Sequence, residues 1–318
     1  MKPKFIICAI TITVMLSATV FANDSAAQAT GTVVKLHVVE YSPTSIPYLI
    51  AREKGYYRDV GLEVQGTLSP PGPGVQALLG GNFDASLATG IPLRAAVSKG
   101  VPVKIVMIFT EKPLFFFFTK TEIASVRELR GKTLASSSPG GSSDTLLRRT
   151  LELDGINPKQ DLTIVYIGLQ STLWLALRNG SVDGAMLVPP YNVLAREGGF
   201  REHEEFTGRI SVLQGGVSLS DKFVKERPDV ARRFLQATTR GLKSYKNDKN
   251  DSIATLAKYM GVPTDTATKI YEGSVTLFTD TGSVSEAYQR QVIQYSIGKF
   301  EPSMLAKAFD FSIVRSFK

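Results

Sequence analysis

The chain has few of the residues from which metal sites and covalent catalysts are built. Its 318 residues include one cysteine, Cys8, and two histidines, His37 and His203. This excludes disulfide-rich scaffolds and zinc sites of the Cys/His type, and we expect no metal ion and no cofactor. A serine hydrolase would have only the two imidazoles as its base. Because His37 falls in a predicted strand and His203 in a polar stretch, we expect no catalytic residue and no enzymatic activity.

Long apolar runs are also absent, except at the N-terminus. Lys2 and Lys4 precede an apolar run over residues 5–20, and Val20-Phe21-Ala22 ends it with a pattern that a signal peptidase reads. This predicts a secretory signal peptide over residues 1–22, cleaved after Ala22, and a periplasmic protein. A membrane anchor is the alternative, but the run is shorter than the ~20 residues that a spanning helix needs.

The excess of positive charge is small. The chain carries 37 basic and 29 acidic residues, a net charge of +8, and removal of residues 1–22 with their two lysines and no acid leaves +6. The densest basic segment, residues 232–249, alternates with apolar residues at helical spacing, which indicates a solvated helix face. No nucleic-acid-binding motif is present, so we expect no nucleic acid partner.

The order of strand and helix signals predicts an α/β fold. A length of 318 residues with 43% hydrophobic residues exceeds what one core usually holds, about 250–300 residues, so we expect two lobes. Strand, helix and strand patterns then alternate, which favours parallel strands joined by crossover helices. The predicted strands are residues 33–39, 62–66, 85–88 and 103–109, and the predicted helices are residues 45–53, 75–79 and 92–98.

This order occurs twice along the chain. Residues 62–92 contain a strand, a loop, a helix, the turn Gly81-Asn-Phe-Asp84, a short strand and a proline, and residues 162–191 repeat them around Gly180-Ser-Val-Asp183. The repetition of all these features predicts two similar α/β lobes. We expect both glycines to adopt the left-handed conformation that ends a helix, and both aspartates to bond to their own backbone as the chain enters the next strand.

Six predicted loops at the carboxyl ends of strands share one composition. Residues 41–45, 69–74, 89–92, 136–143, 169–172 and 188–191 contain no Lys, Arg, Asp, Glu or His. Ligands of open α/β sheets bind at such loops, where helix N-termini present free N–H groups. We expect them to bind a polar solute through hydroxyl and backbone groups, without burying a side-chain charge. The predicted ligand-binding residues are Tyr41, Ser42, Thr44, Ser45, Pro71, Gly72, Thr89, Gly90, Ser137, Ser138, Gly140, Gly141, Ser142, Gln170, Pro189 and Tyr191.

The loop at residues 136–143 has the composition of an anion site. Gly140 and Gly141 let the backbone approach a ligand closely, and the following serines can cap a helix. The alternative is that these serines only cap the helix and fill a solvated turn. We further expect Trp174 to belong to the core and Arg94 to be a solvated helix residue.

Several segments together resemble a known family. They are residues 46–62, Asn82-Phe-Asp-Ala85, Gly131-Lys-Thr133, residues 176–184 and Pro189-Pro190-Tyr191. In order and spacing they resemble the periplasmic solute-binding proteins of ABC importers, in the branch for sulfonate, nitrate and taurine and for the pyrimidine precursor of thiamine. The resemblance covers nearly all of residues 33–317. It implies a type II periplasmic-binding fold, with two similar α/β lobes joined by two hinge crossings and a ligand cleft between them.

The resemblance also implies domain boundaries. Residues 1–22 would be the signal peptide and 23–32 a flexible N-terminus, residues 33–112 with 221–318 the first lobe, and residues 113–220 the second. The crossings would be the extended segments 114–119 and 215–220, although the phenylalanine run at 115–118 can equally be a buried strand.

The implied function is that of the extracytoplasmic substrate-binding component of an ABC transporter. It would capture a small organic anion, sulfonate- or carboxylate-like, and deliver it to the transmembrane subunits of an ABC permease, as a monomer. Two alternatives stay open, which are binding of a pyrimidine or aromatic precursor and a sensory role without transport.

Overall fold

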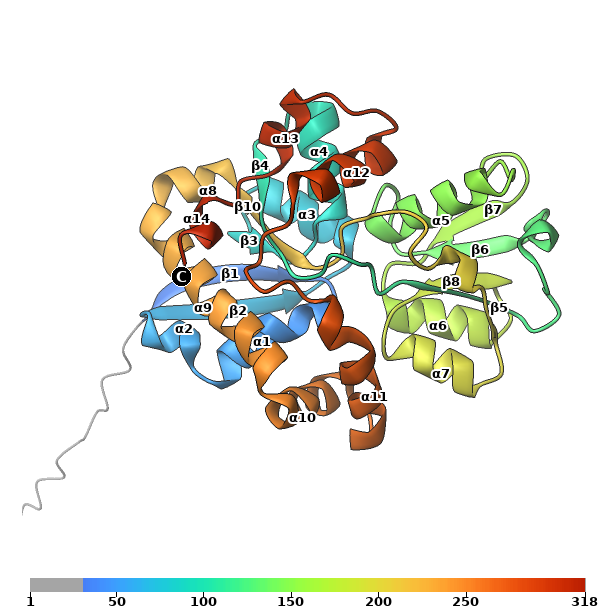
Figure 1. The fold of residues 1–318 in the computed structure, drawn as a ribbon, viewed down its shortest axis with the longest axis horizontal. Coiled ribbons are helices and arrows are strands. Elements are labelled where there is room, and N and C mark those ends of the chain that lie inside the picture. The colour runs from blue at the N-terminus through green and yellow to red at the C-terminus, as the bar shows by residue number, and fades with distance from the viewer. Residues whose placement is uncertain (1–30, 318) are drawn as a thin grey trace, which may run out of the picture. The chain divides into compact units, whose positions relative to one another are not determined.

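The computed structural model describes residues 31–317, so the predicted signal peptide and nearly all of the predicted N-terminal segment 23–32 lie outside the described residues. The described chain forms two lobes, each built on a five-stranded sheet (Figure 1). The two-lobe α/β fold is therefore confirmed. The first sheet has the order β2-β1-β3-β10-β4 and the second the order β7-β6-β8-β5-β9.

The two sheets have the same topology. In each, the first three strands are parallel, and the fourth, β10 or β5, runs antiparallel to both of its neighbours. That antiparallel strand follows a crossing from the other lobe. The strands are β1 (Thr32–Val38), β2 (Leu62–Leu68), β3 (Ala85–Ser86), β4 (Val103–Ile108), β5 (Phe116–Thr119), β6 (Thr133–Ser136), β7 (Thr163–Tyr166), β8 (Gly184–Leu187), β9 (Arg201–Glu202) and β10 (Gly216–Ser220).

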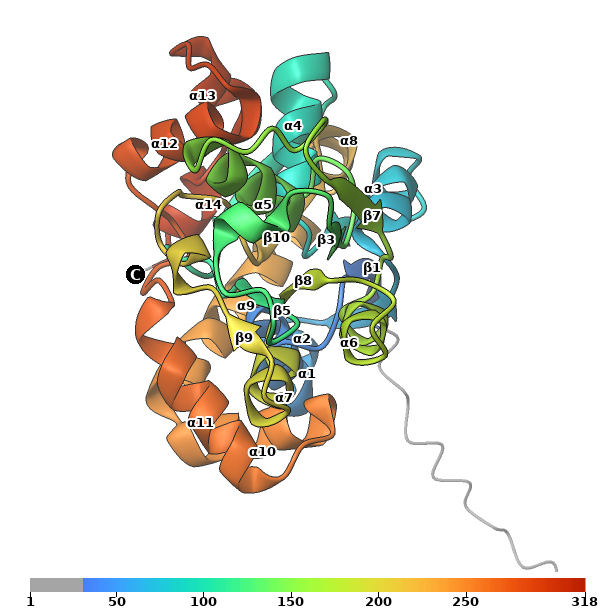
Figure 2. The ribbon, with the colours of Figure 1, turned by 90° about the vertical axis from the view of Figure 1, so that its right-hand side faces the viewer.

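Helices cover both faces of each sheet. In the second lobe α5 lies on one face and α6 and α7 on the other, and the C-terminal helices α8–α14 pack around the first lobe (Figures 1 and 2). The helices are α1 (Ile46–Glu53), α2 (Tyr56–Asp59), α3 (Pro71–Leu79), α4 (Gly90–Lys99), α5 (Ser142–Leu153), α6 (Gln170–Arg178), α7 (Tyr191–Glu197), α8 (Asp221–Glu226), α9 (Pro228–Asn247), α10 (Lys249–Met260), α11 (Thr264–Ser274), α12 (Glu286–Ile297), α13 (Ser303–Ala308) and α14 (Ser312–Arg315), with short 3-10 turns η1 (Pro43–Ser45), η2 (Val126–Leu129), η3 (Glu204–Phe206) and η4 (Val275–Leu277).

The duplicated turn is the same in both lobes. Gly81 and Gly180 have φ values of 79° and 74°, the left-handed conformation expected for them. Asp84 accepts a hydrogen bond from the backbone N–H of Lys35 in β1 at 2.9 Å, and Asp183 accepts one from the N–H of Thr133 in β6, also at 2.9 Å. Each aspartate thus bonds to the neighbouring strand rather than to its own turn, and fixes where the next strand enters the sheet.

The cores follow from strand alternation. In the second lobe, Phe117 and Leu134 face one apolar cluster with α5, whereas Phe118 and Ala135 face another with α6 and α7. Successive residues of a strand point to opposite faces, so one short strand serves both clusters. The first lobe has a larger cluster, which includes residues of α9 and of the C-terminal helices.

Two expectations about the crossings and loops are corrected. Residues 216–220 are not a hinge segment of the second lobe, because they form β10, which pairs with β3 and β4 of the first sheet. Of the predicted crossing 215–220, only Gly215 lies outside this strand, and its φ is 70°. The predicted loop at 69–74 ends earlier, since Pro71 starts α3, where a proline's fixed φ and missing N–H suit the first turn of a helix.

Within residues 31–317, no helix is both long and apolar enough to cross a bilayer.

The contact between α1 and α9 requires a glycine. A Cβ atom on Gly241 would lie 2.0 Å from the Pro47 carbonyl oxygen. We therefore expect Gly241→Ala to lower the free energy of unfolding by about 1–3 kcal/mol, as overpacked core substitutions do. The matched control is Gly273→Ala in α11, where nothing lies within 4 Å of the new methyl group and alanine should raise stability by up to about 1 kcal/mol. Urea unfolding measures both, and similar effects of the two substitutions would contradict the packing described.

Candidate functional site

A pocket lies where both lobes and the crossings meet. It encloses about 730 Å³ of space, part of which is open to solvent. The first lobe contributes the segments that follow β1, β2 and β3, and the second those that follow β6 and β7. Phe115 and residues 213–215 come from the crossings. The lining residues are Val39, Glu40, Ser42, Thr44, Ser45, Pro71, Leu87, Ala88, Thr89, Gly90, Ile91, Phe115, Ser137, Gly141, Ser142, Ser143, Gly168, Leu169, Gln170, Leu213, Gln214 and Gly215.

Helix N-termini converge on this pocket. The first residues of α4, α5 and α6 are Gly90, Ser142 and Gln170, and all three line it. Because the first N–H groups of a helix have no partner within the helix, these ends supply hydrogen-bond donors to a solute. Such an arrangement binds acceptor oxygens without a cationic side chain.

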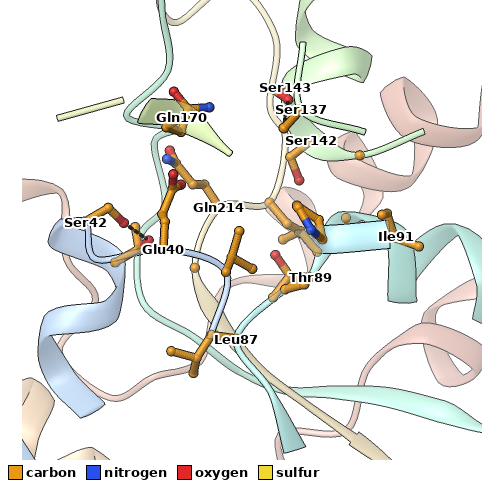
Figure 3. Close-up of a pocket in the computed structure, with 18 of the residues that line it drawn as sticks. Glu40, Ser42, Leu87, Thr89, Ile91, Ser137, Ser142, Ser143, Gln170 and Gln214 are labelled. Atoms are coloured by element: carbon orange, nitrogen blue, oxygen red, sulfur yellow. Dashed lines mark hydrogen bonds between the residues drawn. The ribbon is translucent and has the colours of Figure 1, made fainter. Parts of the chain in front are cut away.

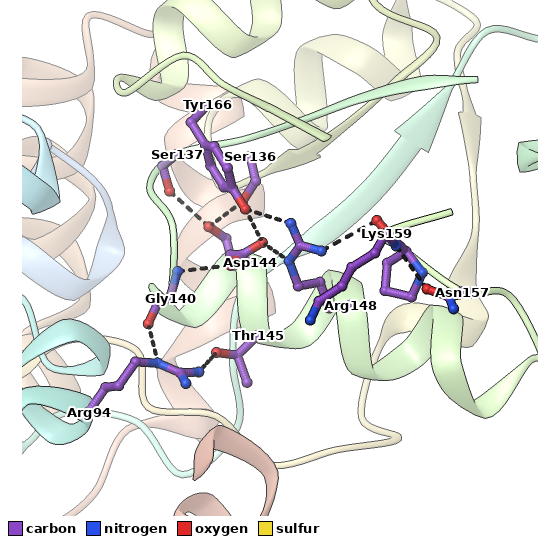
Figure 4. Close-up of polar contacts among 12 residues, drawn as sticks. Arg94, Ser136, Ser137, Gly140, Asp144, Thr145, Arg148, Asn157, Lys159 and Tyr166 are labelled. Atoms are coloured by element: carbon purple, nitrogen blue, oxygen red, sulfur yellow. Dashed lines mark hydrogen bonds and ion pairs between the residues drawn. The ribbon is translucent and has the colours of Figure 1, made fainter. Parts of the chain in front are cut away.

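The loop before α5 is held by a chain of hydroxyl groups. Ser143 Oγ lies 2.9 Å from Ser136 Oγ and 2.8 Å from Ser137 Oγ. Asp144, in the first turn of the helix, accepts the N–H of Gly140 at 2.8 Å and pairs with Arg148 at 2.8 Å (Figure 4). The negative charge that favours a helix N-terminus is thus already present in the protein. The Asp144 carboxylate therefore occupies the place at this helix N-terminus that a bound anion would favour.

Glu40 is the one titratable side chain among the lining residues that the structure describes. It follows β1, and its carboxyl group makes no hydrogen bond or ion pair with another residue of the 31–317 segment. Burial raises the pKa of Glu40 from 4.5 to about 8, because the charged form loses hydration without gaining a partner. Glu40 lies one residue outside the six predicted loops and stays uncharged below about pH 8, so the expectation that the site buries no side-chain charge stays a prediction.

Of the predicted ligand-binding residues, ten line the pocket: Ser42, Thr44, Ser45, Pro71, Thr89, Gly90, Ser137, Gly141, Ser142 and Gln170. These ten residues come from five of the six predicted loops and line one cavity. That these ten residues contact a ligand stays a prediction.

The other six predicted residues do not line the pocket, for local reasons. Tyr41 packs edge-on against Tyr259, with ring centroids 5.3 Å apart. Ser138 is buried, and the Gly140 carbonyl accepts from Arg94 at 3.3 Å. The last three are Gly72, one residue beyond the lining Pro71, Pro189, which lines a different cavity beside α11, and Tyr191, which packs against the apolar cluster under α6 and α7.

The sequence reasoning missed twelve lining residues, of two kinds. Most are apolar or backbone positions, for which no sequence signal distinguishes a pocket wall from a core: Val39, Leu87, Ala88, Ile91, Phe115, Gly168, Leu169, Leu213 and Gly215. The polar ones are Glu40, Ser143 and Gln214. Glu40 immediately precedes a predicted loop, so a boundary one residue earlier would have included it.

The remaining candidates have structural roles. His37 Nε2 donates to the Ser69 carbonyl at 2.9 Å and Nδ1 lies 2.7 Å from Ser86 Oγ, so this imidazole ties β1 to β3 and to the segment before α3. His203 is buried against Thr119 at 2.8 Å, and Trp174 belongs to the core as expected. Arg94 is not simply solvated, because it reaches across the cleft to the other lobe.

Comparison with known proteins identifies the fold and the family. The family model described as "NMT1/THI5 like" matches residues 42–251. The riboflavin-binding protein RibY of Chloroflexus aurantiacus is 28% identical over 213 residues, which is 62% of this chain and 57% of that protein. The chain thus matches little more than half the length of this curated relative.

Solved structures of solute-binding proteins share the fold at low identity. The alkanesulfonate-binding protein SsuA from Xanthomonas axonopodis pv. citri, bound to MOPS, superposes with a TM-score of 0.68 at 20% identity, covering 84% of this chain and 90% of that chain. The nitrate-binding protein NrtA from Synechocystis PCC 6803 gives 0.68 at 15%, covering 90% and 85%. The desulfurization enzyme DSZB gives 0.63 at 14%, covering 89% and 98%, so the fold also occurs in an enzyme.

The raised pKa of Glu40 predicts a pH dependence of stability. The folded protein holds this proton up to about pH 8, whereas an ordinary glutamate releases it near 4.5. The stabilising contribution is therefore fully present below pH 4.5 and is lost as the pH rises toward 8, by an amount on the order of 3–5 kcal/mol. Glu40→Gln cannot ionise, so its free energy of unfolding should exceed that of the wild type increasingly between pH 5 and 8.5. A constant difference over this range, by urea unfolding without added solute, would contradict the burial of an unpaired carboxyl.

Proposed function

Because the chain belongs to the NMT1/THI5-like family, we propose that it is the extracytoplasmic solute-binding component of an ABC importer. It captures a small organic solute in the pocket between its lobes and delivers it to the transmembrane subunits of a permease. The observation that carries this proposal is the pocket itself, to which strand ends and helix N-termini of both lobes contribute. A periplasmic location and a monomeric state belong to the same proposal.

The contacts between the lobes support capture by closure. Arg94 of α4 donates to the Gly140 carbonyl at 3.3 Å, Arg149 of α5 donates to the Tyr295 carbonyl at 3.0 Å, and a Cβ on Gly90 would lie 2.3 Å from Ser142 Oγ. The lobes therefore touch at the rim of the pocket. A solute that contacts both of them binds this closed arrangement more tightly than an open one, and shifts the population toward it.

Binding rather than catalysis is supported by the composition of the pocket. Its lining residues include no His, Cys, Lys or Asp, and Glu40 forms no hydrogen bond to a hydroxyl group among the described residues. A nucleophile and its base need such a bond. The same fold occurs in the desulfurization enzyme DSZB, so catalysis should be tested directly. After prolonged incubation with the protein, we expect mass spectrometry to show the bound solute with its mass unchanged.

Two ligand classes are candidates. The helix N-termini support a small organic anion, sulfonate- or carboxylate-like, in agreement with the ligand named for SsuA. The relative named for riboflavin supports a flat aromatic solute, which the apolar lining residues Phe115, Ile91 and Leu213 would also suit.

Solute binding is expected to raise the melting temperature and to compact the protein. A thermal-shift panel of methanesulfonate, acetate, nitrate, uracil and riboflavin on the purified mature chain should reveal a solute that stabilises the folded state by mass action. With that solute at saturation, small-angle scattering should give a smaller radius of gyration, with unchanged circular dichroism. Scattering curves that superimpose for a tightly bound solute would argue for a static site and against closure.

Arg94 offers a test of closure outside the pocket wall. Arg94→Ala removes two hydrogen bonds between the lobes, to the Gly140 carbonyl and to Thr145 Oγ1. A hydrogen bond is worth about 0.5–1.5 kcal/mol, so solute affinity should fall by at least about two- to tenfold. The radius of gyration without solute should increase. The control is Arg127→Ala on η2, an exposed arginine that forms no hydrogen bond or ion pair with other described residues. Equal affinities of the two variants by calorimetry would show that the Arg94 contact does not stabilise the closed form.

A further inference from the structure

A second cavity lies between the lobes, on the other side of the crossing that contains residues 114–116. It encloses about 800 Å³ of space, part of which is open to solvent. Leu114 and Phe116 line this cavity, whereas Phe115 lines the pocket with the strand ends. Successive residues of an extended segment point to opposite sides, so the crossing is a wall that the two cavities share. The remaining lining residues of this hinge cavity belong to α7 and the segment before it in the second lobe, and to α11 in the first.

An amide without a partner lies in the wall of the hinge cavity. Asn192 lines the cavity and is 5% exposed, and its Oδ1 atom is buried with no hydrogen-bond partner among residues 31–317. A buried polar group that forms no hydrogen bond destabilises the folded protein. A carboxamide has both donor and acceptor atoms, so Asn192 offers a molecule in the cavity hydrogen bonds that the protein does not use.

The other polar side chains of the cavity are engaged with neighbouring residues. They take part in one hydrogen bond and two ion pairs: Ser274 with the Ile270 carbonyl, Arg196 with Glu202, and Lys269 with Glu197. Leu114, Phe116, Val193 and Ile270 make the rest of the wall largely apolar. Since the charges are paired and the Asn192 oxygen is not, the cavity fits an uncharged molecule with an apolar body and one hydrogen-bonding end.

Gly273 leaves this cavity open. It lies in the last turn of α11, four residues after Lys269, and therefore on the same lining stripe of the helix. Nothing lies within 4 Å of a Cβ atom placed on Gly273, so packing does not require a glycine there. A helical glycine is less stable than alanine. Space for a ligand supplies a reason for this glycine that packing does not.

The hinge cavity is connected to the pocket through the shared crossing. The N–H of Leu114 donates to Oε1 of Gln214, whose side chain lies in the pocket (Figure 3). In addition, Lys269 of α11 and Glu197 of α7 approach to 3.8 Å and so join the two lobes. A molecule that contacts both helices stabilises this arrangement of the lobes, which is also the one that a solute in the pocket favours.

We propose that the hinge cavity is a second binding site, for a small uncharged molecule with an apolar body that ends in a primary amide or a hydroxyl group. The Asn192 amide forms hydrogen bonds to that end, and Leu114, Phe116, Val193 and Ile270 contact the body. Its binding raises the affinity of the pocket for its solute, and by linkage the solute raises the affinity of the hinge cavity by the same factor. The coupling rests on the proposed function, whereas binding in the hinge cavity does not.

The first experiment measures binding in the hinge cavity with no solute in the pocket. Saturation-transfer NMR titrations of the full mature protein would use hexanamide and N,N-dimethylhexanamide, which has the same body but no amide donor. We expect hexanamide to bind at least about fivefold more tightly. In Asn192→Leu the two should bind equally, without a fall in melting temperature, because an apolar group of similar size replaces an unpaired amide. Absence of hexanamide binding at millimolar concentration, or discrimination that persists in folded Asn192→Leu, overturns the proposal.

The second experiment fills the cavity. Gly273→Leu places a side chain on the lining stripe of α11, so the affinity for hexanamide should fall at least about tenfold. The control is Lys307→Leu on α13, an exposed helical position outside both cavities, which should bind hexanamide as the wild type does. Melting temperatures show whether each variant is folded. Undiminished binding of hexanamide to folded Gly273→Leu locates the bound molecule elsewhere and overturns the proposal.

The third experiment tests the coupling. Saturating hexanamide should raise the affinity of the wild type for the solute found in the thermal-shift panel at least about fivefold by calorimetry, and should not do so in Gly273→Leu. Hexanamide alone should also reduce the radius of gyration of the wild type. Equal solute affinities, or an unchanged radius with hexanamide bound, overturn the coupling. Failure of every panel solute to bind while hexanamide still binds contradicts the proposed function and leaves the hinge cavity as a binding site.

Discussion

The pocket depends on the hydrogen bonds that hold the two chain crossings side by side. Phe109 N–H donates to the Gly215 carbonyl at 3.1 Å, and Thr110 Oγ1 donates to the Gln214 carbonyl at 2.7 Å. The Gln214 side chain adds a third bond, to the N–H of Leu114. One residue therefore joins the crossings and also lines the pocket. Any rotation of the lobes about these crossings must change the pocket itself, which couples solute contacts to the arrangement of the lobes.

The parts of the fold that follow from local chemistry could be predicted from the sequence. The turns at Gly81 and Gly180 need a residue in the left-handed conformation. In both turns the aspartate follows three residues later in the sequence, because the same short turn joins the end of a helix to the start of a strand. The residues that determine this turn are consecutive in the sequence. Its repetition therefore predicted two similar lobes. The helix predicted over residues 92–98 begins two residues earlier, at Gly90, and the predicted helix after the serine loop begins at Ser142. Both could be predicted to within about a turn because loop and helix signals are adjacent in the chain.

The parts that depend on pairing between distant segments could not be predicted in this way. Residues 216–220 have the glycine and extended pattern of a linker, yet they pair with β3 and β4, more than a hundred residues earlier in the chain. The role of Gln214 has the same origin, because its partners lie on the other crossing. Nothing near these residues in the sequence encodes the pairing. The apolar pocket wall was equally hidden, because Phe115 and Leu213 have the pattern of core residues.

Glu40 shows why a binding site can differ from the local rules that predict a fold. A protein selected for stability alone would place a neutral residue or a cationic partner there, since burial moves the pKa of this carboxyl to about 8. Gln170 and Gln214 line the same pocket, and the hydrogen bonds that their amide oxygens accept hold these side chains in place before a solute arrives. A group whose partner is missing in the protein discriminates strongly between solutes that supply the partner and those that do not, because the wrong solute leaves the desolvation unrelieved. Within residues 31–317 this carboxyl has no hydrogen-bond partner, so the pocket retains a polar group that a solute can satisfy.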